Sequence, residues 1–434
     1  MIEKNKINKN QDEEIIQKEI IKKIDSFVKN NDSELERHYF CIIDKKSLSE
    51  KRLTTSSIYE NISEYDFNAS LLKVSVVVLT ANLFECEILN YNVYKDNNKK
   101  KIKKLDSGIV LFPQIGSRPV EAYILEINEY SVLHLKAPET GSNTPCGSAD
   151  LVRHISTNNY IRPSTIISFG ICYGIDYNNQ SFGDTLIAEK VYPWSIGVKI
   201  NDEGWSIKHD DYVINIREKA TELYSKIHDV FKGKQDNNKK IKFSNVIFGN
   251  MLTGEAVVSN ERIKIKAIEN AHGCKIIGGE MEGYGLAKEC IYYSNITCLI
   301  VKAICDWGAC KNINEILPKY TKQKNGRDYK GQIQAYAAYK AYTVLKKIFF
   351  ENIFCKNNIF EIVKNDIINE FYNDRYVQMN ILKNQIKIIM SNNEIEYLKG
   401  SCSDEVINLL IYDLEKSNVL SKKVDEGIIG YSFI

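Results

Sequence analysis

The sequence has few of the residues and patterns that mark metal-binding or membrane proteins. Its six histidines are scattered along 434 residues, and no two of its cysteines have the Cys-x-x-Cys spacing. Both facts argue against a zinc site and against a histidine-dependent catalytic triad. No apolar run reaches the roughly eighteen residues of a membrane span, and the N-terminus lacks the apolar core of a signal peptide. We therefore expect no metal, no cofactor, no membrane contact and a cytoplasmic location.

A strong charge of either sign is also missing. Lys plus Arg total 58 and Asp plus Glu total 56, which gives a net charge of +2. Such a chain has no long-range field to attract nucleic acid, so we expect no nucleic-acid partner. Eleven cysteines are an odd number, and most lie in apolar segments, as is typical of a reducing compartment. The length suggests two or three domains.

The most informative stretch combines glycines with acids. A short apolar run, 274–277, is followed by Gly278-Gly279-Glu280-Met281-Glu282-Gly283. The spacing of apolar residues predicts a helix over 281–294, and the apolar run 297–304 predicts a strand that ends just before Asp306. Ligands of open α/β sheets bind outside the carboxyl ends of strands, so we expect these acids to line one crevice. The alternative is that the acids cap helices or lie in solvated loops.

Three other stretches follow a similar pattern. The apolar run Leu71–Leu79 predicts a strand that leads to Glu85, and 165–169 predicts a strand followed by a glycine turn, Gly170–Gly174. The segment 248–258 contains Thr253-Gly254-Glu255-Ala256-Val257-Val258. The polar stretch 96–101 is interpreted as a hairpin tip. Alternating strands and helices predict an α/β layered sheet.

Taken in order, these motifs resemble the nucleoside phosphorylase superfamily. Within it, they are most similar to the methylthioadenosine/S-adenosylhomocysteine nucleosidases and their longer relatives in multidomain bacterial proteins. The resemblance covers about residues 70 to 350, and each motif alone would be a weak signal. It implies a three-layer, nucleoside-phosphorylase-like α/β sheet flanked by helices over 70–352. Residues 1–69 and 353–434 would then be smaller, mainly helical additions.

The resemblance also implies roles for individual residues. This superfamily cleaves the N-glycosidic bond of nucleosides, with phosphate or water accepting the sugar. Asp306, with a raised pKa, would protonate the departing base, and Glu85 would orient and deprotonate water. The remaining candidates would bind substrate; they are Glu282 at the ribose hydroxyls, Met281 against the sugar, Glu280 beside it, Val257 and Val258 at the base, and Gly170 and Ile171 near the sugar or phosphate.

Two departures from the family pattern bear on the reaction. Val257 stands where the nucleosidases often place an aromatic residue over adenine, and Ser168 stands where bacterial phosphorylases carry a phosphate-binding arginine. Because a phosphate dianion favours a bidentate cation, the loss of that arginine favours water. We predict hydrolysis of a purine nucleoside or nucleotide, by default of adenine. The resemblance to longer, multidomain relatives also implies a role as a nucleotide-depleting effector in phage defence. A phosphorylase and a catalytically inactive nucleotide sensor are the alternatives.

The terminal regions suggest partners. Isoleucines at helical spacing within 11–29 predict an amphipathic helix that packs on the body or on another subunit. Helices are expected near 359–371, 377–390 and 404–417, and a winged-helix-like module fits them. Because this segment is not notably basic, docking to a protein partner is favoured over DNA binding. We also expect a homo-oligomer.

Overall fold

The protein is described here from a computed structural model. The described residues are 2–45, 53–106, 120–138, 140–142, 146–158, 160–194, 198–201, 204–207, 212–232, 245–254, 258, 261–269, 271, 274–293, 296–321, 327–356, 358–371, 376–392, 403–425 and 428–433.

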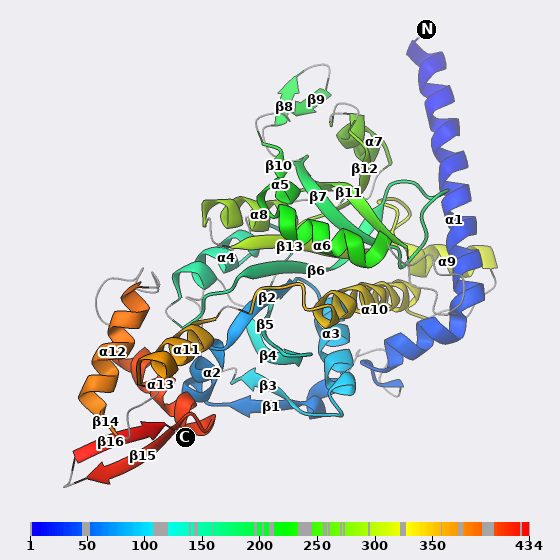
Figure 1. Ribbon diagram of the computed structural model, residues 1–434. Coiled ribbons are helices and arrows are strands. Elements are labelled where there is room, and N and C mark those ends of the chain that lie inside the picture. The colour runs from blue at the N-terminus through cyan, green and yellow to red at the C-terminus, as the bar shows by residue number, and fades with distance from the viewer. Residues whose placement is uncertain are drawn as a thin grey trace.

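Among these residues, one sheet of eleven strands organises the body (Figure 1). Its strands are β1 (Tyr59–Ile62), β2 (Val74–Thr80), β3 (Ile102–Leu105), β4 (Glu121–Ile127), β5 (Tyr130–Lys136), β6 (Thr165–Gly174), β7 (Thr185–Pro193), β10 (Ile214–Asn215), β11 (Val246–Thr253), β12 (Ile276–Glu280) and β13 (Thr297–Asp306). A separate hairpin consists of β8 (Val198–Asn201) and β9 (Gly204–Ile207).

The sheet has an open half and a closed half. The open half runs in the order β1-β3-β4-β5-β2-β6. In the other half β6 pairs with both β12 and β13, and β13, β7, β11 and β12 complete a closed ring of strands. Strands β2, β5, β6 and β13 run in one direction, while β7, β11 and β12 run in the other. The long strand β6 therefore belongs to both halves.

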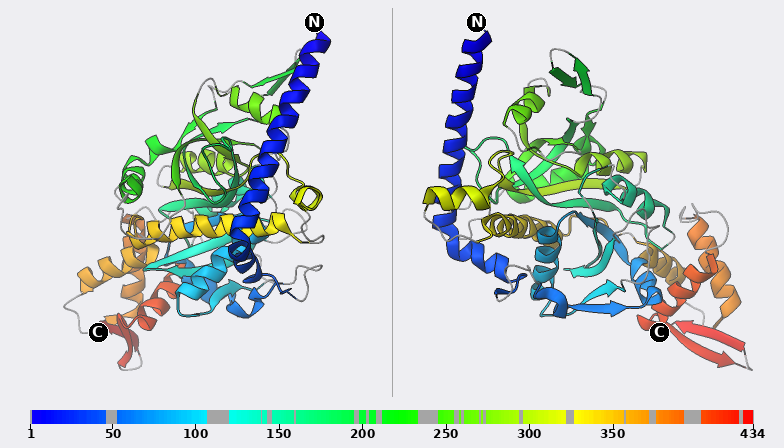
Figure 2. Two further views of the ribbon diagram at one scale, coloured as in Figure 1. Left: turned by 90° about the vertical axis from the view of Figure 1, so that its right-hand side faces the viewer. Right: turned by 180° about the vertical axis from the view of Figure 1, so that it is seen from behind.

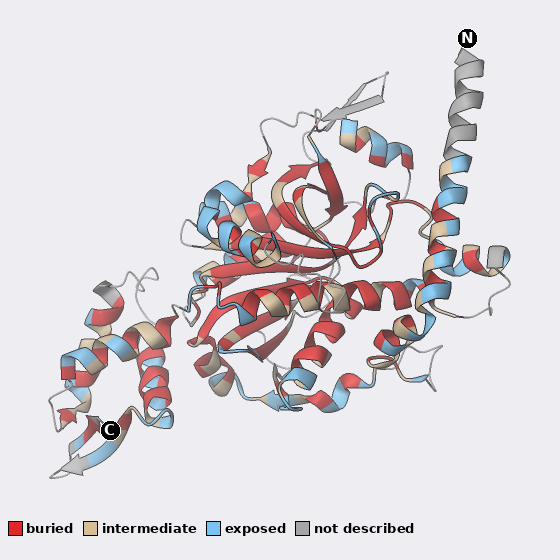
Figure 3. Cartoon of the chain, turned by 45° about the vertical axis from the view of Figure 1, so that its right-hand side comes forward, coloured by how far each residue is buried: buried red, intermediate tan, exposed pale blue. Residues whose placement is uncertain are grey.

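The central strands are buried from end to end. All seven residues of β2 are buried, and so are eight of the ten in β13 (Figure 3). Such continuous apolar runs are typical of strands covered on both faces. The predicted strand at 297–304 is confirmed, whereas the predicted start at Leu71 is wrong. Ser63 caps a helix, α2 (Glu64–Leu71), by accepting a hydrogen bond from the Asp66 backbone N–H, and β2 begins only at Val74.

Helices flank the sheet, which confirms the predicted fold class. Helix α10 (Tyr329–Phe350) packs on α3 (Leu83–Asp96) and on β13 and β6, whereas α8 (Gly283–Tyr292) packs on α4 (Ser148–Thr157) and on β13 (Figure 1). The shorter helices are the 3₁₀ turn η2 (Thr55–Ile58), α5 (Ile216–Lys219), α6 (Thr221–Lys232), α7 (Glu261–Glu269) and α9 (Ile313–Thr321).

Two local predictions were wrong. The expected glycine turn at 170–174 is the last part of β6, because β13 pairs with it from Gly170 to Tyr173 and β12 pairs with it at Tyr173 and Gly174. The expected hairpin tip at 96–101 instead connects α3 to β3, because the chain before it is helical. In both cases pairing or helix packing between distant segments overrides the local glycine and charge signals.

The N-terminal helix is longer than predicted. Helix α1 (Ile2–Phe40) has one non-helical residue, Asn31, where it bends. Its residues Ile20, Ile24 and Val28 are buried in the main core, while its first turns project beyond the body (Figure 2). No helix within the described residues is both long enough and apolar enough to span a membrane.

The C-terminal segment has a core of its own. Its elements are α11 (Ile359–Phe371), β14 (Val377–Gln378), α12 (Met379–Asn392), α13 (Ser403–Lys416), β15 (Leu420–Asp425) and β16 (Ile428–Phe433). The three strands form a sheet in the order β14-β16-β15, and Ala69 and Leu72 join its hydrophobic cluster. Helix α13 packs on α2, and the Lys73 ammonium lies 2.9 Å from the Asp413 carboxylate. The segment is thus docked on the body through α2.

Candidate active site

Three of the four candidate carboxylates, those of Glu85, Glu280 and Glu282, come together near Gly170, partway along β6. Strand β2 ends at this level, since Leu79 pairs with Ser168, and Lys302 of β13 lies opposite Gly170. Strand β12 pairs with Tyr173 and Gly174 and then runs back toward Gly170, because it is antiparallel to β6. The strands that lead to Glu280 and Asp306 run in opposite directions, so these two acids do not lie at the same edge of an open parallel sheet.

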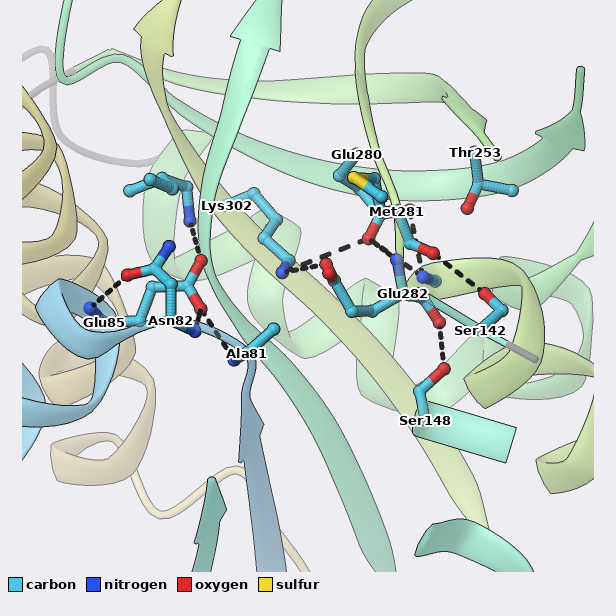
Figure 4. A network of polar contacts seen from close by, with 12 residues as sticks. Ala81, Asn82, Glu85, Ser142, Ser148, Thr253, Glu280, Met281, Glu282 and Lys302 are labelled. Atoms are coloured by element: carbon cyan, nitrogen blue, oxygen red, sulfur yellow. Dashed lines mark hydrogen bonds and ion pairs between the residues drawn. The ribbon is translucent and has the colours of Figure 1, made fainter. Parts of the chain in front are cut away.

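A buried lysine that sequence reasoning missed lies at the centre of the site. The Lys302 ammonium donates a hydrogen bond to Glu282 Oε2 at 3.0 Å and lies 4.0 Å from Glu280 Oε2. Figure 4 shows it between Glu85 on one side and Glu280 and Glu282 on the other. Burial alone would lower the pKa of Lys302, but the carboxylates of Glu282, Glu85 and Glu280 outweigh that effect and raise it. The sequence does show a lysine inside an apolar strand. Because a buried lysine requires a charged or polar partner, this position could have predicted a contact with the acids.

Glu85 is held by the backbone of its surroundings. It lies in the first turn of α3, where Asn82 and Glu85 form a capping box. Its Oε2 accepts hydrogen bonds from the N–H groups of Ala81 (2.8 Å) and Asn82 (3.1 Å), and its Oε1 accepts one from Ile171 (2.9 Å). Burial raises the pKa of Glu85; Lys302 opposes this rise and Glu282 adds to it.

Glu280 likewise caps a helix, α8. Its carboxylate accepts hydrogen bonds from the backbone N–H groups of Glu282 at 2.8 Å and of Gly283 at 2.9 and 3.0 Å. Burial raises the pKa of Glu280 to about 7, although Lys302 opposes the shift. The capping interpretation of the acids therefore applies to Glu280, and Glu85 makes a cap of its own at α3. It does not apply to Glu282, which makes no side-chain cap and instead contacts Lys302.

Two serines fix the backbone that carries the sugar-binding candidates. Ser142 Oγ donates to the Met281 carbonyl at 3.0 Å, and Ser148 Oγ donates to the Glu282 carbonyl at 2.5 Å (Figure 4). Ser142 Oγ also accepts the Gly285 N–H at 3.0 Å. The segment 281–285 is thus tied to the first residue of α4 and to Ser142 in the loop before it, and the Glu282 side chain on this segment contacts Lys302.

Asp306 lies farther along the same strands. It pairs with Tyr173, three residues beyond Gly170, or roughly 10 Å at the usual rise of a strand. Its Oδ1 accepts the Gly308 N–H at 2.7 Å, and the Lys311 ammonium is 3.7 Å from its Oδ2. Burial raises the pKa of the Cys172 thiol; Lys302 opposes this rise, and Asp306, Glu280 and Glu85 add to it.

The structure does not place every candidate. Val258 is buried, whereas Val257 lies outside the described residues. Gly170 and Ile171 border Glu85 directly. In the part of the chain that the structure describes, no group of three or more His, Cys, Asp or Glu side chains is arranged to hold a metal ion.

Replacing Gly170 with alanine should displace Glu85. Gly170 has a φ of +150°, and a Cβ there would overlap the Glu85 carboxylate. We expect Gly170→Ala to lower the free energy of unfolding by about 1–3 kcal/mol, because alanine rarely adopts that φ. Urea denaturation measures the change. Ser168→Ala on the same strand is the control; its buried hydroxyl has no hydrogen-bond partner among the described residues, so its removal should cost little. Equal stability of Gly170→Ala and wild type would contradict this geometry.

The pKa of Glu280 predicts a pH-dependent stability. Since folding raises this pKa from 4.5 to about 7, the protonated carboxyl stabilises the folded state at low pH. This contribution is lost as pH rises from about 4.5 through 7, on the order of 3 kcal/mol in total. In Glu280→Gln the contribution is absent, so the difference in unfolding free energy between wild type and variant should shrink as pH rises. If the difference in unfolding free energy between wild type and Glu280→Gln is constant between pH 5 and pH 8, the pKa of Glu280 is not raised by folding.

The fold and the site define an α/β protein with a buried lysine–carboxylate cluster beside an aspartate at a strand end. No protein-family model and no curated protein matches the sequence. Similar solved structures include the 5′-methylthioadenosine/S-adenosylhomocysteine nucleosidase of Neisseria meningitidis in complex with methylthio-immucillin-A, at 14% identity and a TM-score of 0.43, over 64% of this chain and 99% of that one.

Two further structures are similar over the same share of this chain. The adenine complex of the corresponding nucleosidase from Colwellia psychrerythraea has 13% identity and a TM-score of 0.45, and the match covers 64% of this chain and 96% of that one. The futalosine hydrolase of Helicobacter pylori has 14% identity and a TM-score of 0.44, with 64% and 99% covered. The solved structures that this chain is similar to thus include nucleosidases, the group that its motifs resemble.

Proposed function

We propose that the protein is an N-glycosidase that hydrolyses a purine nucleoside or nucleotide and releases the free base. The observation that carries this proposal is the arrangement of Glu85 and Glu282 on either side of Lys302 (Figure 4). Asp306 lies farther along β6 and β13. That separation suits a ligand with a sugar at one end and a base at the other. The ordered motifs of the sequence support the same assignment.

Glu282 would bind the sugar. Its carboxylate is fixed by Lys302 and by the backbone anchors Ser142 and Ser148, so its free lone pairs can accept hydrogen bonds from the ribose 2′- and 3′-hydroxyls. These bonds strengthen as the ribose becomes oxocarbenium-like, which lowers the barrier to cleavage. Met281 would pack against the sugar. Lys302 would act through Glu282, because its ammonium is already surrounded by carboxylates.

Glu85 would orient the attacking water. Three backbone N–H groups occupy only part of its acceptor capacity, since a carboxylate offers about four lone-pair sites. The remaining sites can accept a hydrogen bond from water and then its proton. The raised pKa of Glu85 makes it a stronger base than an exposed glutamate.

Asp306 would serve the departing base. As the glycosidic bond breaks, the purine takes both bonding electrons, and its imidazole nitrogen becomes more basic. Asp306 would deliver a proton to that nitrogen. The Gly308 N–H holds Oδ1, while Oδ2 lies 3.7 Å from both the Cys305 thiol and the Lys311 ammonium.

Water is favoured over phosphate as the nucleophile. The cation at the centre, Lys302, is shared among three carboxylates, so a phosphate dianion would meet repulsion rather than a free positive charge. Ser168 supplies no charge in place of the arginine of phosphorylases. These charges therefore disfavour the binding of phosphate and are compatible with attack by water.

The test is direct. Purified protein is incubated without phosphate with methylthioadenosine, S-adenosylhomocysteine, inosine, AMP and ATP, and free base is measured by chromatography. We expect release of base, with adenine compounds preferred. Release that requires added phosphate would refute the hydrolase assignment. Binding of a nucleotide without any release would instead support the sensor alternative. Nucleotides are included because the motifs resemble those of longer, multidomain relatives.

A further inference from the structure

Trp307 directly follows Asp306 in the chain, and its side chain is buried in the protein core. Its side chain is 1% exposed, and its ring packs on Phe182 with centroids 5.3 Å apart. A Cβ at Gly174, the last residue of β6, would come within 2.6 Å of the Trp307 ring. The ring therefore fits against β6 only because residue 174 has no side chain. Gly308, on the other side, has a φ of +68° and donates its N–H to Asp306. The position of the Asp306 carboxylate thus depends on where the Trp307 backbone and ring are held.

Two lysines from outside the strand hold Trp307. The buried Lys264 of α7 donates a hydrogen bond to the Trp307 carbonyl at 2.8 Å and is paired with Glu261 at 2.8 Å. The Lys23 ammonium of α1 lies 5.2 Å from the centroid of the Trp307 ring and donates to the Gln180 carbonyl at 2.8 Å. A lysine over the face of an indole is attracted by the negative face of the ring.

Lys23 reaches a second strand of the site as well. The Gln180 side chain, next to the carbonyl that Lys23 binds, donates to the Ile277 carbonyl of β12 at 2.7 Å and accepts the N–H groups of Ile175 and Asp176. Beside it, Phe27 of α1 packs on Phe182 with centroids 4.7 Å apart. Helix α1 therefore contacts the end of β13, the β6–β7 connection and, through Gln180, the strand that carries Glu280.

We propose that Lys23 is a positioning residue of the active site, which keeps Asp306 in place by holding Trp307. The inference rests on the proposed function, in which Asp306 is the acid. In this proposal the N-terminal helix α1 contributes to the geometry of the active site and not only to the stability of the fold. The competing explanation is that Lys23 merely anchors α1, in which case its loss would affect stability and leave the geometry of Asp306 unchanged.

Kinetics of three variants separate these explanations. Lys23→Met keeps the length of the side chain and removes its charge, Lys23→Arg keeps a cation that can stack on the indole, and Lys22→Met alters the exposed neighbour on the same helix. A displacement of about 1 Å can cost on the order of 100-fold in rate, so we expect kcat of Lys23→Met to fall about tenfold or more. KM should change little, Lys23→Arg should recover most of the loss, and Lys22→Met should match wild type. Wild-type kcat in Lys23→Met, or an equal loss in Lys22→Met, would overturn the proposal.

A second readout does not depend on activity. The chain has three tryptophans, so replacing Trp194 and Trp205 with phenylalanine leaves Trp307 as the one indole emitter. In that background, Lys23→Met should shift the emission of Trp307 and increase its quenching by acrylamide, while Lys23→Arg and Lys22→Met should not. If the wild type releases no base, the proposed function fails, and this measurement still decides whether Lys23 holds Trp307. Unchanged emission and quenching would overturn the proposal.

Discussion

Asp306→Asn should lose most of the activity and keep the fold. We expect kcat to fall by about 10²–10⁴-fold, the usual contribution of a general acid, with a smaller change in KM. An asparagine oxygen can still accept the Gly308 N–H, so the turn that fixes the side chain is retained. What the variant lacks is the proton for the departing base. Base release under single-turnover conditions measures the effect.

Asp66→Asn is the control for this experiment. The Asp66 carboxylate also accepts a hydrogen bond, from Ser63 Oγ at 2.8 Å, but it lies in α2, outside the carboxylate cluster and outside the contacts of Trp307. It should retain nearly full activity. If Asp306→Asn is as active as Asp66→Asn, Asp306 is not the acid.

Lys302→Met should show the largest loss of stability. Removing one partner from a buried ionic group leaves the others unpaired, which typically costs about 3–5 kcal/mol. Here the partners are the carboxylates of Glu85, Glu280 and Glu282, of which two are fully inside the core. The midpoint of urea denaturation at constant m-value measures the loss. We expect it to be larger at pH 8 than at pH 6, because the unpaired carboxylates take up protons at the lower pH. Activity should also be lost, since Glu282 loses its anchor.

A double mutant tests whether the loss comes from charge. In Lys302→Met/Glu282→Gln one of the unpaired carboxylates is removed, so the double variant should be more stable than Lys302→Met alone. Lys302→Arg keeps the charge and should retain more stability than Lys302→Met. A Lys302→Met protein within about 0.5 kcal/mol of wild type, the range typical of surface substitutions, would show that the cluster is not a buried ionic group.

Some of the site could be read from the sequence because it depends on local pattern. The buried strand before Asp306 follows from its apolar run, and the helix after Glu282 follows from its periodicity. Other parts depended on pairing between distant segments. The glycines at 170 and 174 look like a turn locally, and only their partners on β12 and β13 make them part of a strand. The functional roles of the carboxylates and the boundaries near residues 69 and 353 stay predictions.

By itself, the sequence determined the α/β class, the buried strands and the identity of the candidate acids, because hydrophobic periodicity and glycine spacing act within a few residues. Only the tertiary structure decided that Lys302 lies among those acids, that β12 runs back along β6 to bring Glu282 to it, and that α1 reaches Trp307. The physical reason is that the partner of a buried charge is set by strand register and helix packing between segments far apart in the chain, which no local pattern encodes.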